Sequence, residues 1–284
     1  MNVDFAAVLV VLMLITGSIW LLDVLALAKR RAASIRALVG KSRERTDVSI
    51  NLPWYVDLSK SFFPVIFAVL VLRSFVAEPF RIPSESMVPT LLNGDFILVN
   101  KFAYGLRLPV LNTKLAGEGK PERGDVVVFR YPPKPSDTYI KRIVGLPGDR
   151  LDYHNNQLFI NGQPVPLIAL SDIGPMGTIY KQFIEQLGGI SHNIQLLSNT
   201  RLGVAGFWFG LQLHRESDGT ISWIYQVPTG HFFVMGDNRD NSADSRYWGL
   251  LPEEYLIGKA FLIWMNWDCV TFNGHCNRIG SSIK

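Results

Sequence analysis

Two serine hydroxyls, those of Ser84 and Ser86, could supply the nucleophile for an acyl-transfer reaction. They lie within residues 80–91, which read Phe-Arg-Ile-Pro-Ser-Glu-Ser-Met-Val-Pro-Thr-Leu and follow the second apolar stretch of the chain. Taken alone, a Ser-x-Ser pair beside proline is more typical of a turn or of a helix N-cap. The pair becomes a candidate catalytic site only if another segment supplies a base.

Lys141 is the best candidate for that base. Along an extended strand, Tyr139, Lys141 and Ile143 point to one face, so the ammonium group would share an apolar surface. Burial there would lower the lysine pKa from about 10.4 to about 7 or 8, which suits a general base. Considered by itself, Lys141 is better explained as a lysine at a strand end that reaches water.

Histidine is the more usual base, but the histidines of this chain lie in no recognisable catalytic motif. The sequence contains neither a Gly-x-Ser-x-Gly elbow nor a His-Glu-x-x-His metal site. We therefore expect a surface or packing role for each histidine, namely His154, His192, His214, His231 and His275.

A third segment, residues 236–246, is a dense polar loop that reads Gly-Asp-Asn-Arg-Asp-Asn-Ser-Ala-Asp-Ser-Arg. With it, residues 80–94, 125–149 and 234–251 resemble the conserved boxes of bacterial signal peptidase I, a family of membrane-bound Ser/Lys proteases. The three matches occur in the family's order, and they follow a similar membrane anchor. Together they support the resemblance more strongly than any single motif would.

The resemblance implies a role for each polar residue of the site. Ser86 would be the nucleophile, and Lys141 the general base that later protonates the leaving amine. Ser84 would help the backbone N–H of Ser86 to bind the oxyanion, and Ser242 would orient the lysine. An ion-pair framework would support these loops through Arg142, Asp237, Asp244 and Arg246. Glu85 departs from the glycine that the family has between the two serines, which bears on local backbone geometry.

The resemblance also implies a shallow apolar cleft that accepts small side chains at the first and third positions before the cut, an Ala-x-Ala pattern. The corresponding positions are Phe80, Ile82, Pro83, Met87, Leu91, Tyr139 and Ile140. Ordinary core packing remains an open alternative for each of them. Trp264, Met265 and Trp267 are candidates for contact with lipid, since Trp favours the membrane interface.

The function implied by the resemblance is a membrane-bound serine endopeptidase that removes N-terminal signal peptides from exported preproteins and uses no metal or nucleotide. Its expected partners are secretory preproteins and membrane lipid, with the export translocon as a further candidate. Two alternatives stay open: a relative of narrow specificity that matures one pilin-like or conjugation substrate, and a membrane-anchored β binding module in which Ser86 and Lys141 are structural.

Two apolar runs near the N-terminus would anchor such an enzyme. Residues 5–22 carry no charge and are long enough to cross a bilayer. A cleaved export signal is the alternative, but Asp4 is the only charged residue ahead of the run. The second span is predicted over residues 58–77, with Arg73 snorkelling outward; a buried core helix is the competing interpretation.

The basic cluster between the runs, residues 29–45, predicts the orientation. By the positive-inside rule this segment stays cytoplasmic, so the N-terminus and all residues from Glu78 onward lie outside. In a Gram-negative cell the protein would span the inner membrane twice and place its catalytic domain in the periplasm. The cluster also suits anionic lipid head groups, and we assign it no role with nucleic acid.

Beyond Glu78 the chain is typical of a mostly β protein. Short strands rich in β-branched and aromatic residues are predicted over residues 95–100, 124–130, 138–144, 157–160 and 231–235. A hairpin should close on Asn161-Gly162. We therefore expect an antiparallel β catalytic domain with a second, smaller β lobe, anchored by two transmembrane helices.

The expected segments are a first span (1–28), a basic loop (29–57), a second span (58–77), a catalytic core in two parts (78–151 and 228–284) and a variable β insertion (152–227). Cys269 and Cys276, the only cysteines, lie on the oxidising side of this topology, which suits a disulfide; two free thiols are the alternative.

Overall fold

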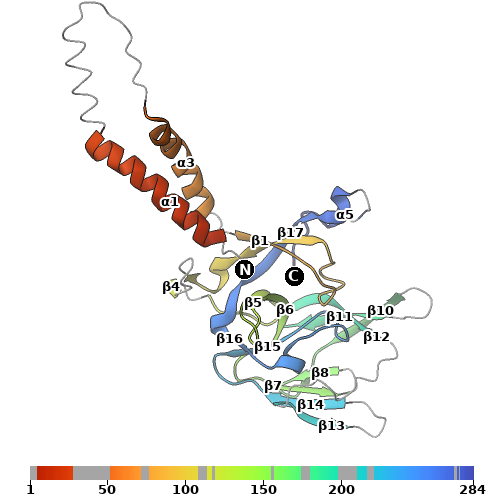
Figure 1. Cartoon of the computed structure of the whole chain (residues 1–284). Coiled ribbons are helices and arrows are strands. Elements are labelled where there is room, and N and C mark those ends of the chain that lie inside the picture. Colours follow the sequence, from red (N-terminus) through yellow and green to blue (C-terminus); the bar gives the residue numbers. More distant parts are fainter. Residues whose placement is uncertain are drawn as a thin grey trace, which may run out of the picture. The chain divides into compact units, whose positions relative to one another are not determined.

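The computed structural model of the chain (Figure 1) describes residues 5–27, 52–71, 77–107, 114–116, 119–154, 157–173, 180–197, 210–215, 221–271, 274 and 276–284. These form two compact units. The first comprises Met1–Val76 with Arg107–Leu115, and the second comprises Ala77–Leu106 with Ala116–Lys284.

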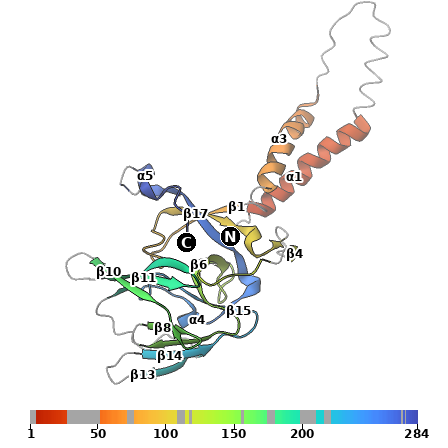
Figure 2. The same ribbon diagram turned by 180° about the vertical axis from the view of Figure 1, so that it is seen from behind.

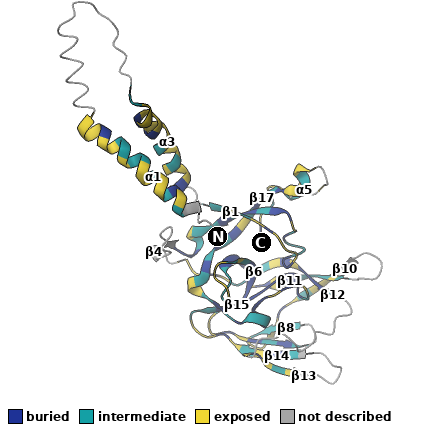
Figure 3. Cartoon of the chain, in the orientation of Figure 1, coloured by how far each residue is buried: buried dark blue, intermediate teal, exposed yellow. Residues whose placement is uncertain are grey.

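The first unit is a pair of apolar helices. Helix α1 spans Phe5–Leu22 and continues into a π-helical turn, η1, at Asp23–Leu27, while α3 spans Trp54–Val71. Both are long and apolar enough to cross a membrane. Only 17% of the candidate span in α3 is buried, which disagrees with a soluble core helix, and Figure 3 shows exposed residues along both helices.

A close approach of side chains joins the two helices. A Cβ atom at Gly17 would lie 2.8 Å from Phe63 Cε2, so only glycine leaves room for this ring. Trp20 packs against the same ring in a tilted arrangement, with 5.4 Å between the ring centroids. Small residues that let helices approach closely are typical of packing between membrane helices.

The second span begins earlier than the sequence predicts. We expected residues 58–77, but α3 starts at Trp54, where Pro53 O accepts the first helical hydrogen bonds. The polar residues Asp57 and Ser59 interrupt the apolar pattern there, so the pattern does not predict this start. Within the helix, Ser59 Oγ donates a hydrogen bond to Tyr55 O. Ala77, the predicted last helical residue, instead opens strand β1. Of the expected basic loop, residues 29–51 lie outside the described residues.

The second unit is built on a seven-stranded antiparallel sheet with the order β1-β2-β17-β5-β6-β15-β16. The strands are β1 (Ala77–Arg81), β2 (Asp95–Asn100), β5 (Val126–Arg130), β6 (Thr138–Gly145), β15 (His231–Met235), β16 (Leu251–Pro252) and β17 (Leu256–Asn266). The apolar run of β5 is buried on both faces: Val126 and Val128 join one core cluster, and Val127 and Phe129 join the other. Strands β5 and β6 pair directly, which fixes where Lys141 lies.

Two smaller sheets follow in the chain. One has the order β13-β14-β7-β8-β9, with β7 at Arg150–His154, β8 at Gln157–Ile160, β9 at Gln163–Pro164, β13 at Gln212–Arg215 and β14 at Ile221–Gln226. The other consists of β10 (Leu167–Ile173), β11 (Tyr180–Leu187) and β12 (Ile190–Leu197). Both views place β13 and β14 at the end of this unit far from β1 and β17 (Figures 1 and 2).

The predicted strands and the mostly antiparallel β fold class are confirmed. The Asn161-Gly162 turn is confirmed as well, because both residues have positive φ (53° and 78°) between the paired strands β8 and β9. Trp223 stacks on Tyr153 and on Phe233, so the region expected as an insertion shares one hydrophobic core with the main sheet. Its division from the catalytic core at residues 152 and 227 stays a prediction.

The remaining described elements are short: β3 (Leu106–Arg107), β4 (Lys114–Ala116), α4 (Ser245–Trp248), α5 (Trp267–Val270) and the 3₁₀ turns η3 (Lys101–Tyr104), η4 (Glu253–Tyr255) and η5 (Cys276–Arg278). Asn266 caps α5 by accepting from Cys269 N. The two cysteines form a disulfide, with their Cα atoms 4.7 Å apart, which excludes the free-thiol alternative.

Candidate active site

Ser86 and Lys141 lie in direct contact. Lys141 Nζ donates a hydrogen bond to Ser86 Oγ at 2.6 Å and a second one to Ile140 O at 2.8 Å. Strand β6 supplies the lysine, and the turn after β1 supplies the serine. Both side chains are buried, with exposed fractions of 4% for Lys141 and 7% for Ser86. A serine hydroxyl and a lysine amine thus meet in a site from which most water is excluded.

Burial lowers the pKa of Lys141 to about 8, although the charges of Asp244 and Asp237 oppose this shift. The predicted shared face is also present, since the ammonium nitrogen lies 5.7 Å from the centre of the Tyr139 ring. An amine with this pKa is neutral in a substantial fraction of molecules near pH 7 to 8. Lys141 can therefore accept a proton from the Ser86 hydroxyl.

Ser84 lies beside Ser86, with the two Oγ atoms 3.4 Å apart. Between them, the side chain of Glu85 is exposed, and Glu85 O accepts a hydrogen bond from Asn238 Nδ2. Among the described residues, Asn161 is the only non-glycine residue with positive φ, so Glu85 has an ordinary backbone conformation. This position needs no glycine.

The polar loop, residues 236–246, packs directly against the serine turn. Asn238 N donates to Ser86 O at 3.1 Å. A Cβ atom at Gly236 would lie 2.4 Å from Ser86 O and 2.3 Å from Ser242 Oγ, so the loop approaches Ser86 through a position without a side chain. Ser242 is buried here, but within the described part of the chain its hydroxyl makes no hydrogen bond to Lys141. Its orienting role stays a prediction.

Two buried arginine–aspartate pairs support the loop, as the sequence predicts for these four residues. Arg142 binds Asp237 with two hydrogen bonds of 2.8 and 2.7 Å. Arg246 binds Asp244 in the same forked manner, with two bonds of 2.8 Å. Burial by itself would raise the pKa of each carboxyl group, but the paired arginine outweighs it and lowers the pKa. Both aspartates are therefore ionised, and each is bound by its arginine partner.

Several residues around the site escaped the sequence analysis. Asn238 carries no signal beyond its place in the polar loop. Thr90 Oγ1 donates to Asp237 Oδ2 at 2.5 Å. His192, expected at the surface or in packing, is buried and lies 3.1 Å from Glu185. No motif marks these contacts: the Thr90–Asp237 contact joins segments distant in sequence, and the His192–Glu185 contact joins neighbouring strands.

The apolar positions predicted to bind substrate divide into two groups. Ile82, Met87, Leu91 and Ile140 are buried in one core cluster, as the alternative of ordinary core packing requires. Phe80 packs against that cluster but keeps some exposed surface, Pro83 is exposed, and Tyr139 is partly buried above Lys141. These last three are the better placed to touch a bound peptide, and the substrate-binding role of all seven stays a prediction.

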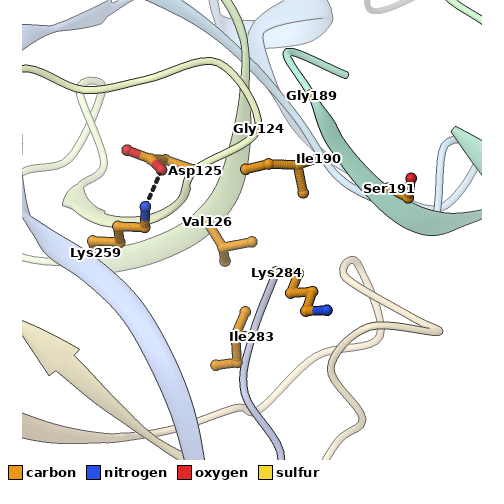
Figure 4. Close-up of a pocket in the computed structure, with 9 residues that line it drawn as sticks. All are labelled: Gly124, Asp125, Val126, Gly189, Ile190, Ser191, Lys259, Ile283 and Lys284. Carbon is orange, nitrogen blue, oxygen red and sulfur yellow. Dashed lines mark ion pairs between the residues drawn. The ribbon is translucent and has the colours of Figure 1, made fainter. Parts of the chain in front are cut away.

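A cavity of about 430 Å³ lies among Gly124, Val126, Ile190 and Ile283 (Figure 4). It contains the ion pair of Asp125 and Lys259, whose charged atoms are 2.5 Å apart. Neither Ser86 nor Lys141 lines it. The Ser86–Lys141 contact, and not this cavity, therefore marks the position of the candidate active site.

Comparison with known proteins gives consistent matches. The family model described as "Signal peptidase, peptidase S26" matches residues 55–267. The chain is 44% identical to signal peptidase I of Pseudomonas fluorescens and 43% identical to that of Pseudomonas aeruginosa, in each case over 94% of both chains. A crystal structure of a signal peptidase I from Enterococcus faecalis is 26% identical and covers 49% of this chain and 96% of that one; its TM-score of 0.28 is too low to compare the arrangement of elements.

The close packing at Gly236 gives a testable expectation. In Gly236→Ala the added methyl group overlaps Ser86 O and Ser242 Oγ, so the serine turn must shift. Because a displacement of about 1 Å at a catalytic group can cost roughly a hundredfold in rate, we expect kcat for cleavage of a precursor protein to fall by about that factor. Ser136→Ala is the control, since Ser136 lies on an exposed turn and its hydroxyl bonds only locally, to Asp137. Normal cleavage by Gly236→Ala would contradict the packing described here.

Proposed function

Since the chain belongs to the signal peptidase S26 family, we propose that it removes N-terminal signal peptides from exported preproteins, using Ser86 as nucleophile and Lys141 as general base. The observation that carries the proposal is the 2.6 Å contact between Lys141 Nζ and Ser86 Oγ, made by a lysine whose pKa burial lowers to about 8. A lysine that served only a structural role would gain nothing from such a shift.

In the proposed reaction, neutral Lys141 takes the proton of Ser86 Oγ as this oxygen attacks the scissile carbonyl carbon. The backbone N–H of Ser86 and the Ser84 hydroxyl stabilise the resulting oxyanion. The Lys141 ammonium group then protonates the departing amine, which leaves an acyl ester on Ser86. Lys141, neutral again, activates a water molecule that hydrolyses this ester and restores the enzyme.

The proposed substrate is an extended peptide with small side chains at the first and third positions before the cut, as in Ala-x-Ala. Its support is the position of Phe80, Pro83 and Tyr139, which keep accessible surface near the Ser86–Lys141 pair. Buried Met87 and Leu91 would set the depth of the cleft from below. A dedicated relative that matures one substrate would share this chemistry and differ only in the peptides it accepts.

We also propose that the protein spans the bacterial inner membrane twice, with the second unit on the periplasmic side. The apolar helices α1 and α3 support the spans, and the basic residues between them support the orientation. On β17 and α5, Trp264 and Trp267 are 41% and 49% exposed, which suits contact with lipid head groups. The export translocon, which would deliver preproteins, is a further proposed partner.

The proposed orientation predicts a protease-protection pattern. Protease added to intact spheroplasts should digest the region after Glu78 and spare residues 29–45, because only the former would face the periplasm. Immunoblots with antibodies against each segment measure this. A protected C-terminal unit in intact spheroplasts, digested only after lysis, would reverse the orientation.

The catalytic pair predicts matched losses of activity. Ser86→Ala and Lys141→Met should each lower cleavage of a purified preprotein in detergent by at least about 10⁴-fold, because a nucleophile and its base act as one unit. The double variant should be no worse than either single one. Ser242→Ala should weaken cleavage without abolishing it.

Ser136→Ala and Lys134→Met are the controls, since both residues lie on an exposed turn and their side chains bond to Asp137. These variants should cleave normally. If Lys141→Met kept near-normal activity, the Ser/Lys mechanism would be wrong. If the unmodified protein hydrolysed no preprotein under any condition, the binding-module interpretation would replace the Ser/Lys mechanism.

The lowered pKa of Lys141 predicts the pH dependence. Below this pKa the lysine is protonated and cannot accept the serine proton; above it the amine is free. kcat/KM should therefore rise with pH through an apparent pKa of about 8 and then level off. Initial rates with one preprotein between pH 6 and 10 measure this. A limb centred near the pKa of a free lysine would show that Lys141 is not buried in the working enzyme.

A further inference from the structure

Strand β12 lies along the polar loop. Gln195 N donates to Asp237 O at 2.9 Å, and Arg239 N donates to Gln195 O at 3.0 Å. Leu197 N donates to the Asp240 carboxylate at 2.7 Å. The other edge of β12 pairs with β11 along its whole length. The three-stranded sheet is thus joined to the loop that holds the Ser86 turn.

Two polar side chains of this sheet enter the loop's charged cluster. Glu185 on β11 and His192 on β12 are direct cross-strand partners and are buried, with exposed fractions of 0% and 5%. Arg239 Nη2 donates to Glu185 Oε2. His192 Nε2 lies 3.1 Å from Glu185 Oε2 and 3.9 Å from Asp237 Oδ1. The imidazole therefore stands between two carboxylates.

This cluster reaches both members of the Ser86–Lys141 pair. Asp237 holds Arg142, which is adjacent to Lys141 in β6. The next loop residue, Asn238, donates from its backbone N to Ser86 O at 3.1 Å. A shift in the Asp237–Arg239 segment would therefore move the serine turn and the support of the lysine strand together.

The charges of the cluster are matched to one another. Burial by itself would raise the pKa of Glu185, but Arg239 and His192 outweigh it and lower that pKa to about 2. Glu185 is thus a buried anion that engages Arg239. Without it, Arg239 would keep only the charges of Asp237 and Asp240 nearby, and Asp237 is already bound to Arg142.

We propose that Glu185 and His192 are positioning residues for cleavage, which hold Asp237 and Arg239 so that Ser86 and Lys141 keep their contact. The inference rests on the proposed peptidase function and assigns to the β10–β12 sheet a part in the active site. Neither residue touches the reacting atoms; both act through the polar loop.

The test compares Glu185→Gln, His192→Gln and Glu185→Asp in the full-length protein in detergent, with one preprotein as substrate. Gln186→Ala is the matched control, because Gln186 is the exposed neighbour of Glu185 on the same strand. Rates are expressed per folded molecule, with the folded fraction taken from thermal unfolding. We expect Glu185→Gln and His192→Gln to lower kcat by about tenfold or more while KM changes by less than about twofold.

The pH profile separates positioning from mere stability. The titratable groups around this cluster and Lys141 are Glu185, His192, Asp237, Asp240, Asp244, Arg142, Arg239, Arg246 and Tyr153. Glu185→Gln removes one negative charge from this set, so the ammonium form of Lys141 is less favoured and the ascending limb of kcat/KM moves to lower pH. Glu185→Asp keeps the charge and should restore the limb to its original position.

Unchanged kcat per folded molecule in both Gln variants, with an unchanged pH limb in Glu185→Gln, would overturn the proposal and leave Glu185 and His192 as structural residues only. Ser86→Ala is assayed in parallel to tell this failure from a failure of the proposed function. If Ser86→Ala is inactive while the Gln variants are normal, only the positioning role is wrong. If Ser86→Ala still cleaves, the Ser/Lys mechanism itself is wrong.

Discussion

The burial of a lysine with a lowered pKa next to a serine is the constraint on which the rest of this site depends. Lys141 is enclosed in the sheet with Asp237 and Asp244 near enough to raise its pKa. A free buried carboxylate there would form an ion pair with the ammonium and hold the proton that catalysis must release. Arg142 and Arg246 prevent this, because each occupies one aspartate with a forked pair of hydrogen bonds. The two pairs are neutral overall, so desolvation prevails at the lysine.

The same constraint explains why the polar loop packs so closely. The loop must bring its aspartates under the lysine strand while leaving room for the serine turn. Gly236 provides this room, since any Cβ atom would overlap Ser86 O. Asp244 Oδ2 accepts from Gly236 N at 3.0 Å, so the residue that caps α4 also fixes the loop at its narrowest point. Backbone conformation and electrostatics are thus set by the same few residues.

Much of the fold could be predicted from the sequence, because the strands show a clear apolar pattern. The strands of the main sheet alternate or run apolar throughout, and the Asn161-Gly162 turn has a strong local signature. The start of α3 could not be read, since Asp57 and Ser59 interrupt the apolar pattern although the helix satisfies their backbone and side-chain hydrogen bonds locally. The burial of each side chain could not be predicted either. The pattern of residues 80–91 does not distinguish fully buried Met87 from exposed Pro83.

In the site, too, some residues could be predicted from the sequence and others could not. Ser86, Lys141 and the two arginine–aspartate pairs were identified from the family resemblance, because their segments have distinctive local sequences. Glu185 and His192 were not, because no motif around them marks a polar cluster. Both lie on the buried face of their strands, Glu185 beside Leu187 and His192 beside Ile194, and this face meets the charged loop. A polar interface between a sheet and a catalytic loop leaves no hydrophobic signal, so only the cross-strand register and the packing of the loop reveal it.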